Sequence, residues 1–265
     1  MSHIRESLGL SERKSCLLVN ISVSAYRYQS KKDNDDTLRC RLRELAGQRK
    51  RFGSPRLHIM LKRENLVVNH KRTERLYREE GLALRRKRRR KGAAGSRVVM
   101  PSAVHPNEHW SMDFVSDSIV TGRRFRALTI IDNYSRECPV IEVDTSLGGA
   151  RVVNVLERLA ETRGLPEVIT MDNGPEFAGK ALDEWAYRKG VRLNFIRPGK
   201  PIENAYAESF NGRLRDECLN TNWFLNLKHA RSVIEDWRRD YNEIRPHGSL
   251  NNLTPEEYAK AAAGF

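Results

Sequence analysis

The sequence contains 265 residues and carries a formal net charge of +14, from 48 lysines and arginines and 34 aspartates and glutamates. This length allows one large domain with a substantial core and a smaller one beside it. No apolar run approaches 18 residues and no signal-peptide pattern is present, which excludes a membrane-spanning protein and predicts a cytoplasmic one.

The positive charge is confined to the first part of the chain. Residues 1–100 contain 27 basic and 10 acidic residues, a net charge of +17, whereas residues 101–265 contain 21 and 24, a net charge of −3. This asymmetry predicts a polyanionic partner that binds mainly to the N-terminal part.

Residues 1–50 are expected to form a small helical region. Ser11 suits the N-cap of a short helix, Asn20 suits a turn, and a second helix restarts behind Ser22. Helix, tight turn and helix outline a helix-turn-helix, although a plain αα-hairpin would give the same pattern. Leucines at helical spacing then predict a further helix over 38–48.

Residues 51–84 predict a second helix-turn-helix, and here DNA contact is favoured over a merely solvated basic helix. Ser54-Pro55 is a strong helix start, with serine at the N-cap and proline at the first helical position. Asn69 suits the N-cap of the next helix, which should stop at Gly81. The basic residues of this helix cluster near its start, which is the part of a recognition helix that contacts DNA. The candidate DNA contacts are Lys71, Arg72 and Arg75.

Residues 85–105 are predicted to be a basic linker. Like charges at this density repel one another, so the free segment should be extended. Bound to DNA, it would release counterions and add affinity without sequence preference; a solubilising tether is the alternative. The seven consecutive bases are Arg85, Arg86, Lys87, Arg88, Arg89, Arg90 and Lys91.

The remainder, 106–265, reads as one α/β domain. Strands are expected at 109–119, 124–132, 139–143, 168–172 and 191–196, with helices over 150–163, 177–189, 201–215 and 227–241. The first three strands are joined by short turns and should be antiparallel. The fourth strand follows a helix and should therefore run parallel to the first.

Three carboxylates stand out in this domain. Asp172 ends an apolar strand and is followed by the turn residues Asn173-Gly174, whereas Asp113 lies in the first strand. Glu208 lies on a helix, on one polar stripe with Asn204, Asn211 and Arg215. Hard divalent cations prefer carboxylate oxygens, and two such ions suit phosphodiester displacement. Asp132 and Glu176 are better explained as a structural acid and as a helix-dipole partner.

The order of these residues resembles a known family. The motifs are, in order, an Asp, an Asp-Asn-Gly and an Asn-Ala-x-x-Glu. Thirty-five residues separate the last two acids, and a basic residue follows the Glu by seven positions. This arrangement resembles the DDE transposase and retroviral-integrase superfamily. More narrowly, the chain resembles the second-reading-frame (orfB) product of the IS-three family of bacterial insertion sequences. The resemblance implies an RNase H-like α/β core, a mixed five-stranded sheet with flanking helices, preceded by a small all-α helix-turn-helix region.

The resemblance also implies an activity and partners. Asp113, Asp172 and Glu208 would hold two Mg²⁺ (or Mn²⁺) ions for DNA strand cleavage and 3′-hydroxyl strand transfer. Partners would be transposon-end and target DNA, a first-reading-frame protein or a fusion with it, and further copies of the chain assembled on DNA at the nucleoid. Lys200, Asn204 and Arg215 are further candidates for phosphate contact, the last two equally for a supporting role beside the acids. The alternatives are a nuclease that cuts without joining and a DNA-binding regulator whose RNase H-like core is inactive.

Overall fold

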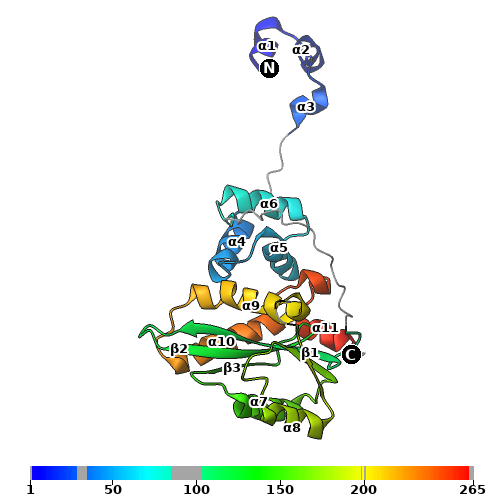
Figure 1. The fold of residues 1–265 in the computed structure, drawn as a ribbon. Helices are drawn as coiled ribbons and strands as arrows, with labels where there is room; N and C mark the ends of the chain where they lie inside the picture. Colours follow the sequence, from blue (N-terminus) through cyan, green and yellow to red (C-terminus); the bar gives the residue numbers. More distant parts are fainter. Residues whose placement is uncertain (1, 29–34, 85–102, 198, 200, 263–265) are drawn as a thin grey trace. The chain divides into compact units, whose positions relative to one another are not determined.

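Short helices and a basic three-helix segment precede a single mixed sheet. The computed structural model describes every residue except 1, 29–34, 85–102, 198, 200 and 263–265 (Figure 1). The chain divides into two compact units, residues 1–41 and 42–265. The predicted division into four segments at residues 50, 84 and 105 remains a prediction, because 85–102 lie outside the described residues.

The first unit begins with α1 (Ser2–Leu8), α2 (Glu12–Leu18) and α3 (Val23–Arg27). The predicted turn between the last two is present, because Asn20 has a positive φ of 54°. Ser22 caps α3, since its hydroxyl accepts a hydrogen bond from the Ala25 amide at 3.1 Å. Two short helices joined by a turn are thus confirmed, as both a helix-turn-helix and an αα-hairpin predict, and α1 is an element that the sequence pattern did not predict.

A second group of helices comprises α4 (Asp36–Gln48), α5 (Ser54–Arg63) and α6 (His70–Glu79). Asn69 caps α6 as predicted, accepting from the Lys71 amide at 3.0 Å, and Gly81 ends the segment with φ 65°. The N-cap of α5 is Gly53, so the prediction of Ser54 was wrong by one residue. Each of the three helices buries leucines, namely Leu42, Leu45, Leu57, Leu61 and Leu76.

The sheet has the strand order β3-β2-β1-β4-β5. Its strands are β1 (His109–Ser118), β2 (Arg124–Asp132), β3 (Val140–Asp144), β4 (Val168–Met171) and β5 (Arg192–Phe195). The first three pair antiparallel, whereas β4 runs parallel to β1 and β5 runs parallel to β4. The predicted mixed five-stranded sheet and the parallel direction of its first and fourth strands are confirmed, and these two strands lie side by side.

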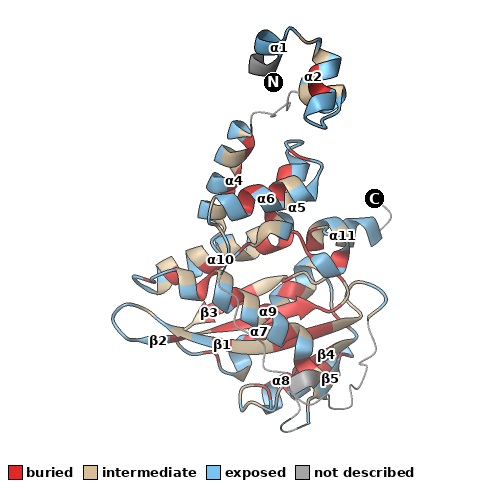
Figure 2. Cartoon of the chain, turned by 90° about the horizontal axis from the view of Figure 1, so that it is seen from above, coloured by how far each residue is buried: buried red, intermediate tan, exposed pale blue. Residues whose placement is uncertain are grey.

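Helices cover both faces of the sheet (Figure 1). One face packs on α7 (Gly149–Thr162) and α8 (Lys180–Lys189), with Trp110 and Trp185 in the core between them. The other face packs on α9 (Ala205–Glu217) and α10 (Leu227–Glu243), with Phe210 and Tyr241 at its centre. Figure 2 shows that burial follows the strands and the inner sides of these helices. Alternate side chains of β1 enter opposite layers: Trp110 and Met112 lie in the first core, and Val115 lies in the second.

Two helix starts differ from the predicted ones. The amides of Phe177 and Ala178 both donate to the carbonyl of Gly174, which forms a compact turn, so α8 begins only at Lys180. A 3₁₀ turn, Pro201–Asn204, precedes α9. A capping box lies near the C-terminus, where Thr254 and Glu257 exchange side-chain to backbone hydrogen bonds at the start of α11 (Pro255–Ala262).

No helix in the described part of the chain is long and apolar enough to cross a membrane.

Candidate active site

Asp113 lies in the middle of β1, on the sheet face covered by α9. Its Oδ1 accepts from the Phe114 amide at 2.7 Å, and its Oδ2 accepts from the side-chain amide of Asn211 on α9 at 2.7 Å. The hydroxyl of Thr129, its partner on β2, lies 2.9 Å from Asn211 Oδ1. Both carboxylate oxygens are therefore held in fixed directions.

Asp172 follows β4 directly and shares the register of Asp113. The parallel pairs run from His109 with Val168 to Ser111 with Thr170, and the same offset carries Asp113 to Asp172 two residues further on. Aligned residues of neighbouring parallel strands face the same side of a sheet. The topology thus brings the two aspartates together, as the sequence predicted.

Gly174 allows the tight turn that orients Asp172. Its amide donates to Asp172 Oδ1 at 3.0 Å. A Cβ added at Gly174 would lie 3.0 Å from the same oxygen and 3.2 Å from Glu176 Oε2. A side chain here would push the carboxylates of Asp172 and Glu176 away by a few tenths of an ångström, so the glycine helps to keep Asp172 in this orientation.

Glu208 comes to the site on α9, and its predicted polar stripe faces β1. Three members of that stripe bond to β1: Asn204 donates to the Met112 carbonyl at 2.9 Å, Asn211 to Asp113, and Arg215 to the Ser116 carbonyl at 3.2 Å. Glu208 lies among them and is itself exposed. The helix is therefore clamped to the strand on both sides of the acid.

The electrostatics of Asp113 reflect this arrangement. Burial raises the pKa of the Asp113 carboxyl, and the negative charges of Asp172 and Glu208 raise it further, while its hydrogen bonds from Phe114 and Asn211 oppose the shift. The charges of Asp172 and Glu208 thus both act on the Asp113 carboxyl. A cation placed among them would relieve the repulsion.

Asp113, Asp172 and Glu208 all offer carboxylate oxygens, which fit a hard divalent cation better than a soft one. Among the residues that the structure describes, no group of three or more His, Cys, Asp and Glu side chains is close enough together to hold a metal ion. The donor chemistry therefore supports the trio as metal ligands, and their joint coordination of an ion remains a proposal.

The candidate DNA contacts on α6 are located at its surface. Lys71 is exposed, and Arg75 forms an exposed ion pair with Glu79 at 3.0 Å. Arg72 is half-buried. Exposed ion pairs are weak and readily exchanged for phosphate. The tract 85–91 and Lys200 lie outside the described residues, so their roles stay predictions.

Two residues of the stripe take different positions relative to solvent. Arg215 is exposed, whereas Asn204 is 3% exposed and is bonded to β1. Burial leaves Asn204 no surface for a phosphate, so the structure favours the supporting role among the two that the sequence left open.

The other acids have structural partners. Asp132 is fully buried, accepts from the amides of Asn107 and Tyr134, and pairs with Arg163 at 3.0 Å, as expected of a structural acid. Glu176 is not at a helix start, because α8 begins four residues later; it pairs with Arg126, which lowers the pKa of its carboxyl. The helix-dipole explanation of Glu176 was therefore wrong.

The sequence did not indicate that Asn211 holds the Asp113 carboxylate or that Thr129 holds Asn211. Asn211 was assigned to the polar stripe, but nothing in its spacing indicated a bond to Asp113. That bond depends on how closely α9 approaches the sheet, which is a tertiary property.

Comparisons with known proteins agree with this architecture. The chain matches the family described as an integrase core domain over residues 103–201 and 189–255, and the family described as an HTH-like domain over residues 33–90. Relatives include the 31.7 kDa protein of insertion element IS407 from Burkholderia multivorans, 50% identical over 98% of this chain and 94% of that protein. The 39.2 kDa protein of insertion element IS476 from Xanthomonas euvesicatoria is 44% identical over 96% of this chain and 74% of that protein.

The fold also resembles a solved structure. A chain of the simian T-cell lymphotropic virus intasome, solved in complex with the PP2A regulatory subunit B56 gamma, superposes with a TM-score of 0.56. The match covers 82% of this chain and 74% of that one at 14% sequence identity, which supports a shared fold and nothing finer.

Proposed function

This chain belongs to the insertion-element transposases that combine an HTH-like domain with an integrase core, and we propose that it cleaves DNA strands at the ends of its element and joins their 3′-hydroxyls to target DNA. The observation that supports the proposal is the shared register of Asp113 and Asp172 on neighbouring parallel strands, together with the effect of the Glu208 charge on the Asp113 carboxyl. Asp113, Asp172 and Glu208 would hold two divalent ions, Mg²⁺ or Mn²⁺.

The side chains around the site have separate tasks. Asn211 and the Phe114 amide hold the Asp113 carboxylate in one orientation, and the Gly174 amide does the same for Asp172. Glu208 comes from a helix that Asn204 and Arg215 fix against β1. When bound, two such ions activate an attacking oxygen and stabilise a departing one in phosphodiester displacement. A nucleophilic serine or tyrosine is then unnecessary, because water or a 3′-hydroxyl attacks directly.

The basic N-terminal part would supply the affinity for DNA. Arg72, Arg75 and Lys71 on α6, together with the tract 85–91, would neutralise phosphates near the core. We further propose that several copies assemble on paired element ends, with a first-reading-frame protein or a fusion to it, at the nucleoid.

Conservative changes to the three acids test the proposal. Asp113→Asn, Asp172→Asn and Glu208→Gln should each abolish cleavage of end DNA in Mg²⁺ while DNA affinity is retained, because each removes a metal-binding charge away from the basic segments. Asp144→Asn, an acid at the end of β3 outside the trio, is the matched control and should cut normally. If any one trio variant cuts at the normal rate, that residue does not belong to the site.

The two rival functions predict other results. A nuclease would release cut strands and never joined ones. A regulator with an inactive core would bind the DNA and leave it intact at every divalent-ion concentration.

A further inference from the structure

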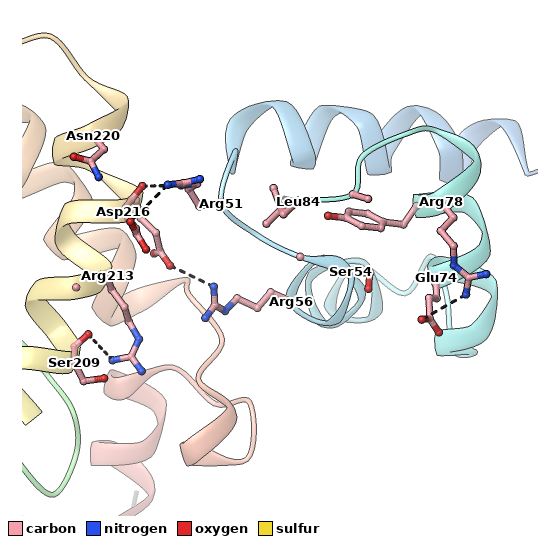
Figure 3. A pocket seen from close by; sticks show the side chains of 15 residues that line it. Arg51, Ser54, Arg56, Glu74, Arg78, Leu84, Ser209, Arg213, Asp216 and Asn220 are labelled. Carbon is pink, nitrogen blue, oxygen red and sulfur yellow. Dashed lines mark hydrogen bonds and ion pairs between the residues drawn. The ribbon is translucent and has the colours of Figure 1, made fainter. Parts of the chain in front are cut away.

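The C-terminal end of α9 contacts the segment that precedes α5. Arg51 Nη2 lies 3.6 Å from Asp216 Oδ1, and its Nε donates to the Asp216 carbonyl at 3.2 Å. Arg56, in the first turn of α5, donates to Glu217 Oε1 at 3.3 Å. Figure 3 shows Arg51, from the turn before α5, and Arg56, from α5, both extending toward α9. These contacts join the segment that carries α6 to the helix that carries Glu208.

A buried arginine lies behind this contact. Arg245 is 1% exposed and forms two bonds with Glu217, of 2.8 and 2.7 Å. Phe52, which is 5% exposed, lies among guanidinium groups, with that of Arg56 5.3 Å and that of Arg245 5.8 Å from its ring centre. A second pair, Arg49 with Asp240 on α10, lies beside it. We call this set of residues the arginine seam: Arg49, Arg51, Phe52, Arg56, Asp216, Glu217, Asp240 and Arg245.

The acids of the seam are in an unfavourable position unless they have partners. A helix C-terminus carries partial negative charge, so Asp216 and Glu217 in the last turn of α9 oppose the helix dipole. Sequences that break such a local rule usually do so for a compensating interaction elsewhere. Here the compensation comes from Arg51, Arg56 and Arg245.

The contacts of the seam border a cavity of about 990 Å³ between the HTH-like helices and α9 (Figure 3). Its lining includes the seam residues Arg51, Arg56, Asp216 and Glu217 as well as Arg78, Ser209 and Arg213. Ser209, next to Glu208 in sequence, therefore lines the same cavity as the seam. Glu208 and Glu217 are nine residues apart on one helix, a rise of about 14 Å at 1.5 Å per residue.

We propose that the arginine seam sets the distance between α6, the candidate DNA-contacting helix, and Glu208, and thereby selects which phosphodiester is cut. This inference rests on the proposed function. Asp216 and Glu217 are then positioning residues, which act by holding α6 at a fixed distance from the helix that carries Glu208.

Reversing the charges of the seam tests this. The variant Arg51→Glu with Arg56→Glu removes both links from the HTH-like side. Its matched control, Arg158→Glu with Arg239→Glu, makes the same charge change at exposed ion pairs elsewhere. The assay maps the cut position on end DNA at single-nucleotide resolution. We expect the seam variant to lower the ratio of correct to neighbouring cuts about tenfold, which corresponds to about 1.4 kcal/mol, with DNA affinity equal to that of the control.

A rescue separates positioning from a loss of folding. Arg51→Glu alone should spread the cuts over neighbouring phosphodiesters. Arg51→Glu combined with Asp216→Arg should restore cutting at the correct phosphodiester, because the ion pair is re-formed with its charges reversed. A seam variant that still cuts at one phosphodiester, or a swap that restores nothing, would overturn the inference.

A distance measurement keeps this test independent of catalysis. Spin labels are attached at Val68→Cys in the HTH-like segment and at Tyr187→Cys in the core, where the native side chains are 86% and 91% exposed. Cys40 is replaced by serine, because it is exposed whereas the other three cysteines are buried. The distance between the labels reports how the segment is held against the core. The seam variant should broaden the distance distribution and the swap should narrow it again. If the wild-type chain never cuts DNA, the proposed function fails; an unchanged distribution in the seam variant overturns the seam itself.

Discussion

Replacing Arg245 by methionine should destabilise the protein strongly, although the residue is remote from the acidic trio. The change keeps most of the side-chain volume but leaves the carboxylate of Glu217, whose side chain is 10% exposed, without its two-bond partner. Removing one member of a buried ion pair costs about 3–5 kcal/mol. Arg56 still lies 3.3 Å from Glu217, so we expect the lower end, about 3 kcal/mol. For a unit of this size that lowers Tm by roughly 6–12 °C.

Urea unfolding followed by tryptophan fluorescence measures this cost, with two variants for comparison. The double variant Arg245→Met with Glu217→Met should recover most of the loss, because replacing both partners of a buried pair by apolar side chains is nearly neutral. Arg51→Met, at an exposed pair, should cost less than about 1 kcal/mol. The reasoning is refuted if Arg245→Met is as stable as Arg51→Met, or if the double variant is less stable than the single one.

Three further predictions concern pH, salt and selectivity. Burial, and then the charge of Arg245, lowers the pKa of His247 to about 3 in the folded protein. The imidazole of the unfolded chain therefore binds a proton at a higher pH than that of the folded protein. The free energy of unfolding accordingly decreases as the pH falls below about 6.5. Between pH 7 and pH 5 the free energy of unfolding should decrease by about 2 kcal/mol because of His247. Urea unfolding of His247→Gln at both pH values should show a decrease that is smaller by this amount. Neutralising residues 85–91 should weaken binding to all DNA sequences alike and reduce the log–log salt slope by about 0.9 per lost phosphate contact, whereas an unchanged slope would mean that the tract is only a tether. The isolated chain should discriminate element ends from scrambled DNA less well than a fusion to the first-reading-frame protein, by about 1–3 kcal/mol per contacted base pair in competition binding; equal selectivity would make α6 the main reader of the ends.

Local patterns in the sequence predicted most of the fold, because the strands of the core are marked by apolar runs and its turns by glycine and asparagine. The parallel direction of the fourth strand follows from its connection through one helix. The placement of Asp113 near Asp172 followed only from the resemblance to the RNase H-like fold. The stripe on α9 was predictable, since helical periodicity alone places Asn204 and Glu208 on one side.

Contacts between distant segments were not predictable in this way. The bond from Asn211 to Asp113 joins residues 98 apart, and that from Arg56 to Glu217 joins residues 161 apart. Neither has a periodic signature, because each depends on the packing of completed elements. The start of α8 was misplaced for a related reason: Phe177 continues the helical pattern, but its burial in the core favours the turn at Gly174.

The central claim is that the trio performs strand transfer, and the most direct measurement is the formation of joined product. The wild-type chain, and its fusion to the first-reading-frame protein, are incubated with labelled end DNA, target plasmid and Mg²⁺, and the label is followed into plasmid-sized DNA. We predict covalent joining of the 3′-end to the target, abolished by EDTA and by Glu208→Gln. Label that is cut but never joined by either protein, or joining that persists in Glu208→Gln, would contradict the claim.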